Sequence, residues 1–126
     1  MTTESPSGRP RTRVVRDTMG ELEIPAEAYY GAQTARAMRN FPVSGQPARW
    51  EIFQAMLMIK KAAALTHGEL GLLDRRVSTA IAAACDDLLN GAHRDQFVVD
   101  VFQAGAGTSL NTVSYTHLTL PTIYSV

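Results

Sequence analysis

The feature that most constrains the fold is the stretch from residue 50 to residue 66, which is apolar almost throughout. Its only charged side chains are Glu51, Lys60 and Lys61, and neither glycine nor proline interrupts it. A segment of this length and composition predicts a helix, and apolar residues around its whole circumference predict packing on more than one side. The rest of the chain must therefore surround this helix.

A second helix is predicted over residues 77–89, where apolar side chains recur every three or four positions. Asp74 suits the cap before it, and Asn90-Gly91 marks its end. Cys85 falls in the apolar stripe and is interpreted as a small buried hydrophobic residue. We expect the two helices to pack as an antiparallel pair. The residues expected at their contact are Ile52, Met56, Ile59, Ala63, Val77, Ile81, Ala84 and Leu88.

The first part of the chain predicts little helix. Residues 1–12 are polar and are expected to form a disordered arm. Residues 13–24 alternate loosely between apolar and polar side chains, which predicts a short extended segment or a small hairpin with Gly20 at its turn. Residues 26–38 are typical of a helical segment broken by Gly31. The predicted fold class is therefore mainly α, with a short extended segment near the N-terminus.

Composition excludes several classes of protein. The 126 residues are 45% hydrophobic, which is enough for one domain with a core. Lys and Arg number 12, as do Asp and Glu, so no nucleic-acid partner is expected; the cluster Arg9, Arg11, Arg13 and Arg16 is interpreted as a solvated arm. One cysteine allows no intrachain disulfide, and neither a secretory signal nor an apolar run of ~18 residues is present. We expect a soluble, cytoplasmic chain without a membrane partner.

The most suggestive motif for function is the glycine-rich stretch from residue 103 to residue 111. Gly105 and Gly107 bracket one small residue, and Thr108 and Ser109 follow directly. Glycines let a backbone approach a ligand closely, and Thr108 or Ser109 could cap a helix whose N–H groups and positive dipole end attract a carboxylate or phosphate. An ordinary loop with a helix cap remains the alternative reading of this motif.

Six further blocks of sequence resemble the opening of the aspartase/fumarase superfamily. In chain order they are Asp17-Thr18-Met19-Gly20-Glu21, Ile24-Pro25, Ala28-Tyr29-Tyr30-Gly31-Ala32-Gln33-Thr34, Asn40-Phe41-Pro42-Val43-Ser44-Gly45, Gly71-Leu72-Leu73-Asp74 and Asp95-Gln96-Phe97. Their order and spacing match that family, and the chain is identified as a member. The resemblance implies that residues 13–111 are a truncated N-terminal helical domain of such a lyase, without its central bundle helices.

The resemblance also implies the reaction, a reversible anti-elimination on a small dicarboxylate or amino-acid substrate. A base removes a Cβ proton, negative charge develops on the neighbouring carboxylate, and ammonia or water leaves. Thr108, Ser109 and Asn111 are the expected substrate-binding residues, in that order of preference, although Asn111 also suits helix-end packing. The base is a serine of later family sequence, so no catalytic residue is expected here. Neither a cofactor nor a metal site is expected, and full-length members form homotetramers.

Three details resemble aspartate ammonia-lyases more than class II fumarases. Ala106 stands where fumarases typically carry serine, Ser109 follows Thr108 without an intervening glutamine, and Tyr29-Tyr30 precedes the glycine at 31. The favoured reading is an N-terminal fragment of an aspartate ammonia-lyase-like enzyme. A fragment of class II fumarate hydratase and a non-enzymatic module that binds partner subunits are the alternatives.

Residues 112–126 depart from the family pattern. They contain no Asp, Glu, Lys or Arg and are rich in β-branched side chains, whereas family members continue with Met-Asn-x-Asn-Glu and a long helix. A frameshift or read-through is the favoured explanation, and a divergent natural C-terminus is the alternative. We expect the isolated chain to be inactive. His67, His93 and His117 are expected to be structural or solvated rather than catalytic.

Overall fold

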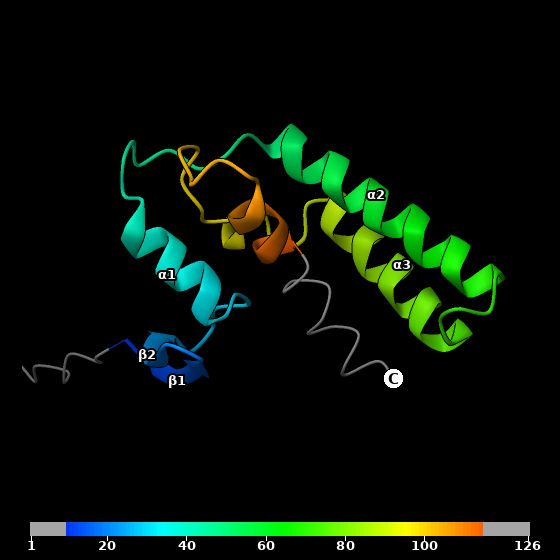
Figure 1. Ribbon diagram of the computed structural model, residues 1–126, viewed down its shortest axis with the longest axis horizontal. Coiled ribbons are helices and arrows are strands. Elements are labelled where there is room, and N and C mark those ends of the chain that lie inside the picture. Colours follow the sequence, from blue (N-terminus) through cyan, green and yellow to red (C-terminus); the bar gives the residue numbers. More distant parts are fainter. Residues whose placement is uncertain (1–9, 115–126) are drawn as a thin grey trace, which may run out of the picture.

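The computed structural model describes residues 10–114, and most of its regular structure is helical (Figure 1). An antiparallel hairpin of β1 (Thr12–Asp17) and β2 (Gly20–Pro25) comes first. Three helices and a short 3₁₀ helix follow: α1 (Ala32–Asn40), α2 (Trp50–Glu69), α3 (Arg75–Leu89) and Arg94–Gln96. A further helical stretch covers residues 108–114, where the described residues end. The expected mainly α fold with an extended N-terminal segment is confirmed.

The hairpin turns where the sequence predicts it. Asp17 pairs with Gly20 across a two-residue loop, and Gly20 has a φ of +113°, which glycine adopts without strain. The Asp17 carboxylate accepts a hydrogen bond from the N–H of Met19 at 2.9 Å and pairs with the Arg36 guanidinium of α1 at 2.8 Å. This hydrogen bond from Arg36 lowers the pKa of Asp17. The ion pair ties the hairpin to α1.

Two expectations for this region are wrong. The helical segment predicted over residues 26–38 with a break at Gly31 is helical only after that break, from Ala32, and Gly31 is extended (φ −111°, ψ −162°). Arg13 is also not part of a solvated arm. Its guanidinium donates to the carbonyl oxygens of Ala28 at 2.8 Å and Tyr30 at 3.2 Å. Both side-chain hydrogen bonds hold the 26–31 turn against β1.

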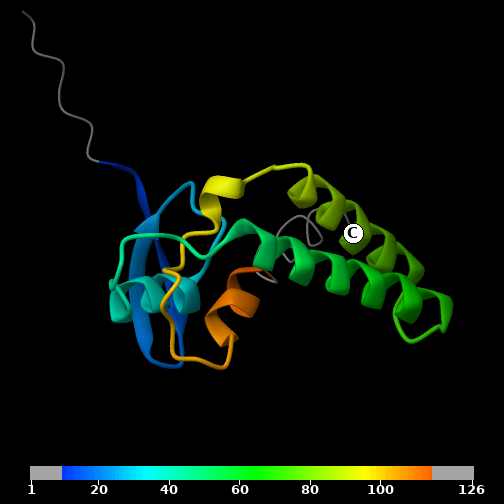
Figure 2. The same cartoon turned by 90° about the horizontal axis from the view of Figure 1, so that it is seen from above.

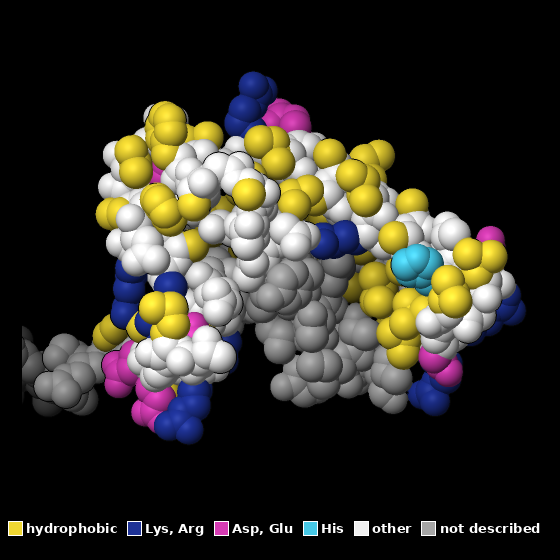
Figure 3. Space-filling model, viewed as in Figure 1, with side chains coloured by type: hydrophobic (Ala, Val, Ile, Leu, Met, Phe, Trp, Pro, Cys, Tyr) yellow, Lys and Arg dark blue, Asp and Glu magenta, His cyan; other side chains and the backbone are white. Residues whose placement is uncertain are grey.

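The long helices α2 and α3 form the expected antiparallel pair (Figures 1 and 2). The predicted contact face of α2 is wrong, however. Phe53, Leu57 and Ala64 are buried, whereas Ile52 is 42% and Ile59 is 69% exposed. The buried positions each lie one residue after a predicted one. Apolar side chains surround α2, so periodicity does not single out the face that packs. Apolar side chains of α2 therefore also cover part of the outer surface (Figure 3).

The start and packing of α3 follow the sequence more closely. The Asp74 carboxylate caps the helix by accepting the Arg76 N–H at 2.8 Å. Cys85 and Leu88 are buried as expected. Ser78 donates to the carbonyl oxygen of Ala64 at 2.8 Å and lies so close to Gly68 that a Cβ there would collide with it. The two helices therefore touch at Gly68 without room for a side chain, and α2 continues past this point to Glu69.

Burial concentrates in two clusters that meet along the irregular segment after α3. The smaller cluster joins the hairpin to α1, and its buried residues are Leu22, Ile24, Ala28, Tyr30 and Ala35. The larger one joins α2, α3 and the segment around Phe97 and Val99, and it includes Val113 of the 108–114 helical stretch. Across residues 10–114, every helix is too short or too polar to cross a lipid bilayer.

Candidate functional site

An aromatic cluster at the start of α2 supports the candidate site. The Phe97 ring lies 4.7 Å from the Phe53 ring and 5.3 Å from the Trp50 ring, edge-on to the latter. The Arg94 guanidinium lies 4.8 Å from the centre of the Trp50 ring, a cation–π contact. Aromatic pairs of this geometry stabilise beyond their buried area. These ring contacts hold Phe97 in the core. The segment that leads to the glycine-rich stretch starts from this fixed point.

The next residues are held by a hydrogen-bonded anchor around Asp100, which is only 7% exposed. Its carboxylate accepts hydrogen bonds from the backbone N–H groups of Ser44 at 2.9 Å, Gly45 at 2.9 Å and Phe102 at 2.8 Å. The Ser44 hydroxyl donates to it as well, at 3.0 Å. Together these donors, the Phe102 N–H foremost, lower the pKa of Asp100. Asp100 therefore remains ionised and binds the 44–45 turn to the chain just before the glycines.

Backbone hydrogen bonds continue this anchor on both sides of Asp100. The N–H of Ala48 donates to the carbonyl of Val99 at 3.0 Å, and the N–H of Val101 donates to the carbonyl of Gln46 at 2.9 Å. Pro47 lies opposite Asp100 in this short bridge. The loop between α1 and α2 thus runs antiparallel to residues 99–101 and supports them.

A glycine turn and a helix start follow the anchor. Gly105 and Gly107 have φ angles of +109° and +72°, in the region that side chains disfavour. The first helical hydrogen bond runs from the N–H of Asn111 to the carbonyl of Gly107 at 3.0 Å, and Thr108 is the first helical residue. The expectation that Thr108 or Ser109 caps this helix is therefore wrong, because Gly107 occupies the cap.

The structure brings the three expected substrate-binding residues together in the first turn of the 108–114 helix. Thr108 and Asn111 are exposed, and Ser109 is half-buried. A spacing of three residues places Thr108 and Asn111 on one face of the helix. The Asn111 Oδ1 accepts a hydrogen bond from the Lys60 Nζ of α2 at 2.7 Å. Helix geometry provides no intrahelical acceptor for the N–H groups of residues 108–110, so this end can receive an anion.

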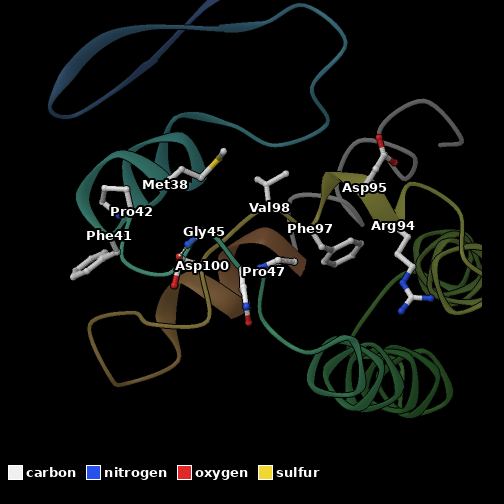
Figure 4. A pocket seen from close by; sticks show the side chains of 11 residues that line it. Met38, Phe41, Pro42, Gly45, Pro47, Arg94, Asp95, Phe97, Val98 and Asp100 are labelled. Carbon is white, nitrogen blue, oxygen red and sulfur yellow. Dashed lines mark hydrogen bonds between the residues drawn. The ribbon is translucent and has the colours of Figure 1, made fainter.

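A separate cleft of about 470 Å³ lies between α1 and residues 94–100 (Figure 4). Its lining is mainly apolar, with Met38, Phe41 and Val98 on one side and Arg94 and Asp95 at the far end. The residues that line it belong to 38–47 and 94–100, whereas the expected substrate-binding residues lie at 108–111. This cleft is therefore not the site that the glycine-rich motif indicates.

His67, His93 and Cys85 occupy structural positions. The carbonyl of His67 closes the end of α2 by accepting the N–H groups of Leu72 and Leu73. His93 has a φ of +53°, and its ring lies 4.0 Å from that of Tyr29. His117 lies outside the described residues. Burial raises the pKa of the Cys85 thiol to about 11, so the thiol is not a reactive nucleophile. Within residues 10–114 no three His, Cys, Asp or Glu side chains gather as a metal site would need.

Sequence reasoning missed the residues that support the site. Ser44 and Gly45 entered only as part of a family block, and Asp100, which lies in an apolar run just before the glycine-rich stretch, was not singled out. A single acid in an apolar run is itself a signal, because a buried carboxylate requires donors. Lys60 carried a comparable signal, since it is one of two lysines in the middle of a largely apolar helix.

Comparison with known proteins gives a consistent result. Residues 20–118 match the lyase family. The chain is 50% identical over 99 residues to a class II fumarate hydratase of Halobacterium salinarum and 48% identical over 99 residues to an aspartate ammonia-lyase of a Bacillus species, in each case over 79% of this chain. It superimposes on the crystal structure of a recombinant class II fumarase from Schistosoma mansoni with a TM-score of 0.84 at 37% identity, over 89% of this chain and 24% of that one. The chain spans about a fifth of the two curated relatives, 21% of each.

Proposed function

Because the chain belongs to the lyase family of the aspartase/fumarase superfamily, we propose that it is the N-terminal part of an aspartate ammonia-lyase-like enzyme. The reaction is the reversible elimination of ammonia from L-aspartate to give fumarate. The observation that carries the proposal is the helix start at Thr108, behind a glycine turn that a buried anchor holds. Backbone N–H groups and hydroxyls in that position suit a substrate carboxylate.

The chemistry explains why such donors matter. Removal of the Cβ proton places additional negative charge on the neighbouring carboxylate, and a fixed donor that meets this charge lowers the barrier. One such donor contributes about 2.7–4 kcal/mol in oxyanion holes. Thr108 offers both its N–H and its hydroxyl, and Asn111 offers its amide from the same helix face. The resemblance assigns the proton-abstracting serine to family sequence downstream of residue 111.

Fumarate hydratase is the second candidate, because class II fumarate hydratases are as similar to this chain as aspartate ammonia-lyases are. Ala106 supports the aspartase reading, since a serine hydroxyl at this place could donate to the substrate and alanine cannot. The two candidates share the dicarboxylate and the developing charge. They differ in the leaving group, which is ammonia in one and water in the other.

The DNA that follows codon 111 gives the first test. We expect a continuation with Met-Asn-x-Asn-Glu and a long helix in one of the reading frames. The protein translated through that continuation is called the complete enzyme below. If no frame encodes such a continuation, the proposal of an N-terminal part is wrong and the chain is a separate module.

Activity gives the second test. The purified 126-residue chain should form no fumarate from aspartate or from malate, because the proton-abstracting loop is proposed to lie downstream. The complete enzyme should form fumarate from aspartate far faster than from malate, as followed by ultraviolet absorbance. Preference for malate would replace aspartate ammonia-lyase with fumarate hydratase, and turnover by the 126-residue chain would contradict the proposed division of the site.

A further inference from the structure

Two adjacent lysines in the middle of α2 bind different parts of the molecule. Lys61 forms an ion pair with Asp86 of α3 and so joins the helix pair. Lys60 instead reaches the 108–114 helix, where its Nζ lies 2.7 Å from the Oδ1 of Asn111. The contact joins residues 51 positions apart in sequence and ends in the turn that holds Thr108.

The chemistry of the pair determines which way the Asn111 amide faces. An ammonium group has three donors and no acceptor, so it binds only the oxygen of a side-chain amide. The orientation of an amide is decided by its hydrogen bonds, and here Lys60 supplies the deciding one. The Asn111 amide nitrogen therefore faces away from Lys60 and offers two N–H donors on the helix face shared with Thr108.

The charge of Lys60 is only partly compensated. Partial burial lowers the pKa of Lys60, and its partner is a neutral amide, whereas Lys61 has a carboxylate. Among residues 10–114, no carboxylate forms an ion pair with Lys60. Its positive charge therefore lies beside a helix N-terminus, where the helix dipole is also positive. An anionic ligand would reduce the repulsion between these two charges.

We propose that Lys60 is a positioning residue of the dicarboxylate site: it orients the Asn111 amide toward the carboxylate bound at Thr108 and adds positive charge behind it. The identity of the ligand rests on the proposed function, whereas the orientation of Asn111 rests on the contact alone. Lys60 does not touch the reacting atoms and acts through Asn111. Lys61, next to it in sequence, offers a matched control because its partner is on α3.

Nuclear magnetic resonance of the 126-residue protein tests the orientation without activity. The side-chain amide signals of Asn111 are identified by their loss in Asn111→Ser. Lys60→Met keeps the length and helix preference of the side chain and should shift or average these signals, whereas Lys61→Met should leave them in place. Unchanged Asn111 signals in Lys60→Met would overturn the proposal.

Kinetics of the complete enzyme test the consequence. Lys60→Met should lower kcat/KM for aspartate by about 10- to 100-fold, the range expected when a hydrogen bond to a charged group is lost. Lys60→Arg should recover part of that loss, and Lys61→Met should change kcat/KM less than threefold. Equal effects of Lys60→Met and Lys61→Met would reduce Lys60 to a structural role and overturn the proposal. An enzyme inactive on both substrates would refute the proposed function, and the Asn111 signals would then decide this inference by themselves.

Discussion

The two halves of the segment that leads to the candidate site differ sharply. In residues 97–103, Phe97 and Val99 are buried in the main core and Asp100 is bound by donors from the 44–45 turn. In residues 104–107 the chain is exposed apart from a half-buried Gly107, and two of the four residues have positive φ. One half is fixed by contacts, and the other is shaped by the conformations that glycine permits.

The difference shows how such a loop can have a fixed position and still expose its backbone N–H groups. The buried half sets the position and direction of the chain, so the exposed half does not need contacts of its own. The exposed half can then leave its N–H groups available to a ligand at the start of the 108–114 helix. If this division holds, substitutions of the buried side chains in residues 97–103 lower stability, and substitutions in residues 104–107 change it little unless they replace a glycine.

The largest loss of stability is expected from Phe97→Ala. Phe97 is 4% exposed and packs against Trp50 and Phe53, so its removal leaves a cavity in the core. The free energy of unfolding should fall by about 3–5 kcal/mol, as measured by chemical denaturation. Phe102→Ala is the matched control within the same half: Phe102 is 58% exposed and should change stability by less than about 0.5 kcal/mol. Similar losses in both variants would mean that burial in the core is not what fixes this half.

An intermediate effect is expected from Asp100→Asn, which turns an acceptor of four hydrogen bonds into a group that also donates. The melting temperature at neutral pH should fall, less than in Phe97→Ala. The pKa of Asp100 lies below its ordinary value of 3.8 in the folded state, so its stabilisation is complete above that value and is lost as pH falls through the folded pKa.

Unfolding at low pH separates the contribution of Asp100 to stability from that of Asp17, whose pKa is lowered as well. The unfolding midpoint of the parent protein should fall as the pH drops below about 4. Asp100→Asn should remove part of that pH dependence and leave the part due to Asp17. An unchanged acid slope in Asp100→Asn would mean that the anchor does not hold the segment.

The smallest stability loss is expected from Gly107→Ala in the exposed half. Open space surrounds the position, so no collision opposes the new methyl group, but the φ of +72° costs a side chain about 1–2 kcal/mol. Ala106→Ser is the control, because Ala106 is exposed and lacks a positive φ. Thermal denaturation of both variants should show a loss in the first and none in the second. Equal stability would contradict the idea that glycine conformation shapes this half.

The sequence predicts most of the fold but less of the site. Asp74 as a cap, Gly20 at a hairpin turn and the stripe around Cys85 are local signals, and the structure confirms them. The buried face of α2 was predicted wrongly, because apolar side chains on every side leave the choice to tertiary packing. Ile59 shows this, since a large apolar residue in mid-helix is 69% exposed.

The support of the site depends on pairs that are distant in sequence, and periodicity carries no information about such pairs. Ser44 and Asp100 lie 56 positions apart, and Lys60 and Asn111 lie 51 apart. The glycine motif itself predicted a helix start at the right place, but it assigned the cap to Thr108 or Ser109 rather than Gly107. A motif thus located the turn, and only the folded chain shows which residues hold it.

The most direct test of the central claim is Thr108→Val in the complete enzyme. Valine keeps the size of the side chain and removes the hydroxyl, so folding should be retained. Steady-state kinetics on aspartate should show a loss of roughly 2–4 kcal/mol in transition-state stabilisation. Most of it should appear in kcat, because the carboxylate gains charge only as the proton leaves. Unchanged turnover of aspartate by a folded Thr108→Val enzyme would remove Thr108 from the site and contradict the account.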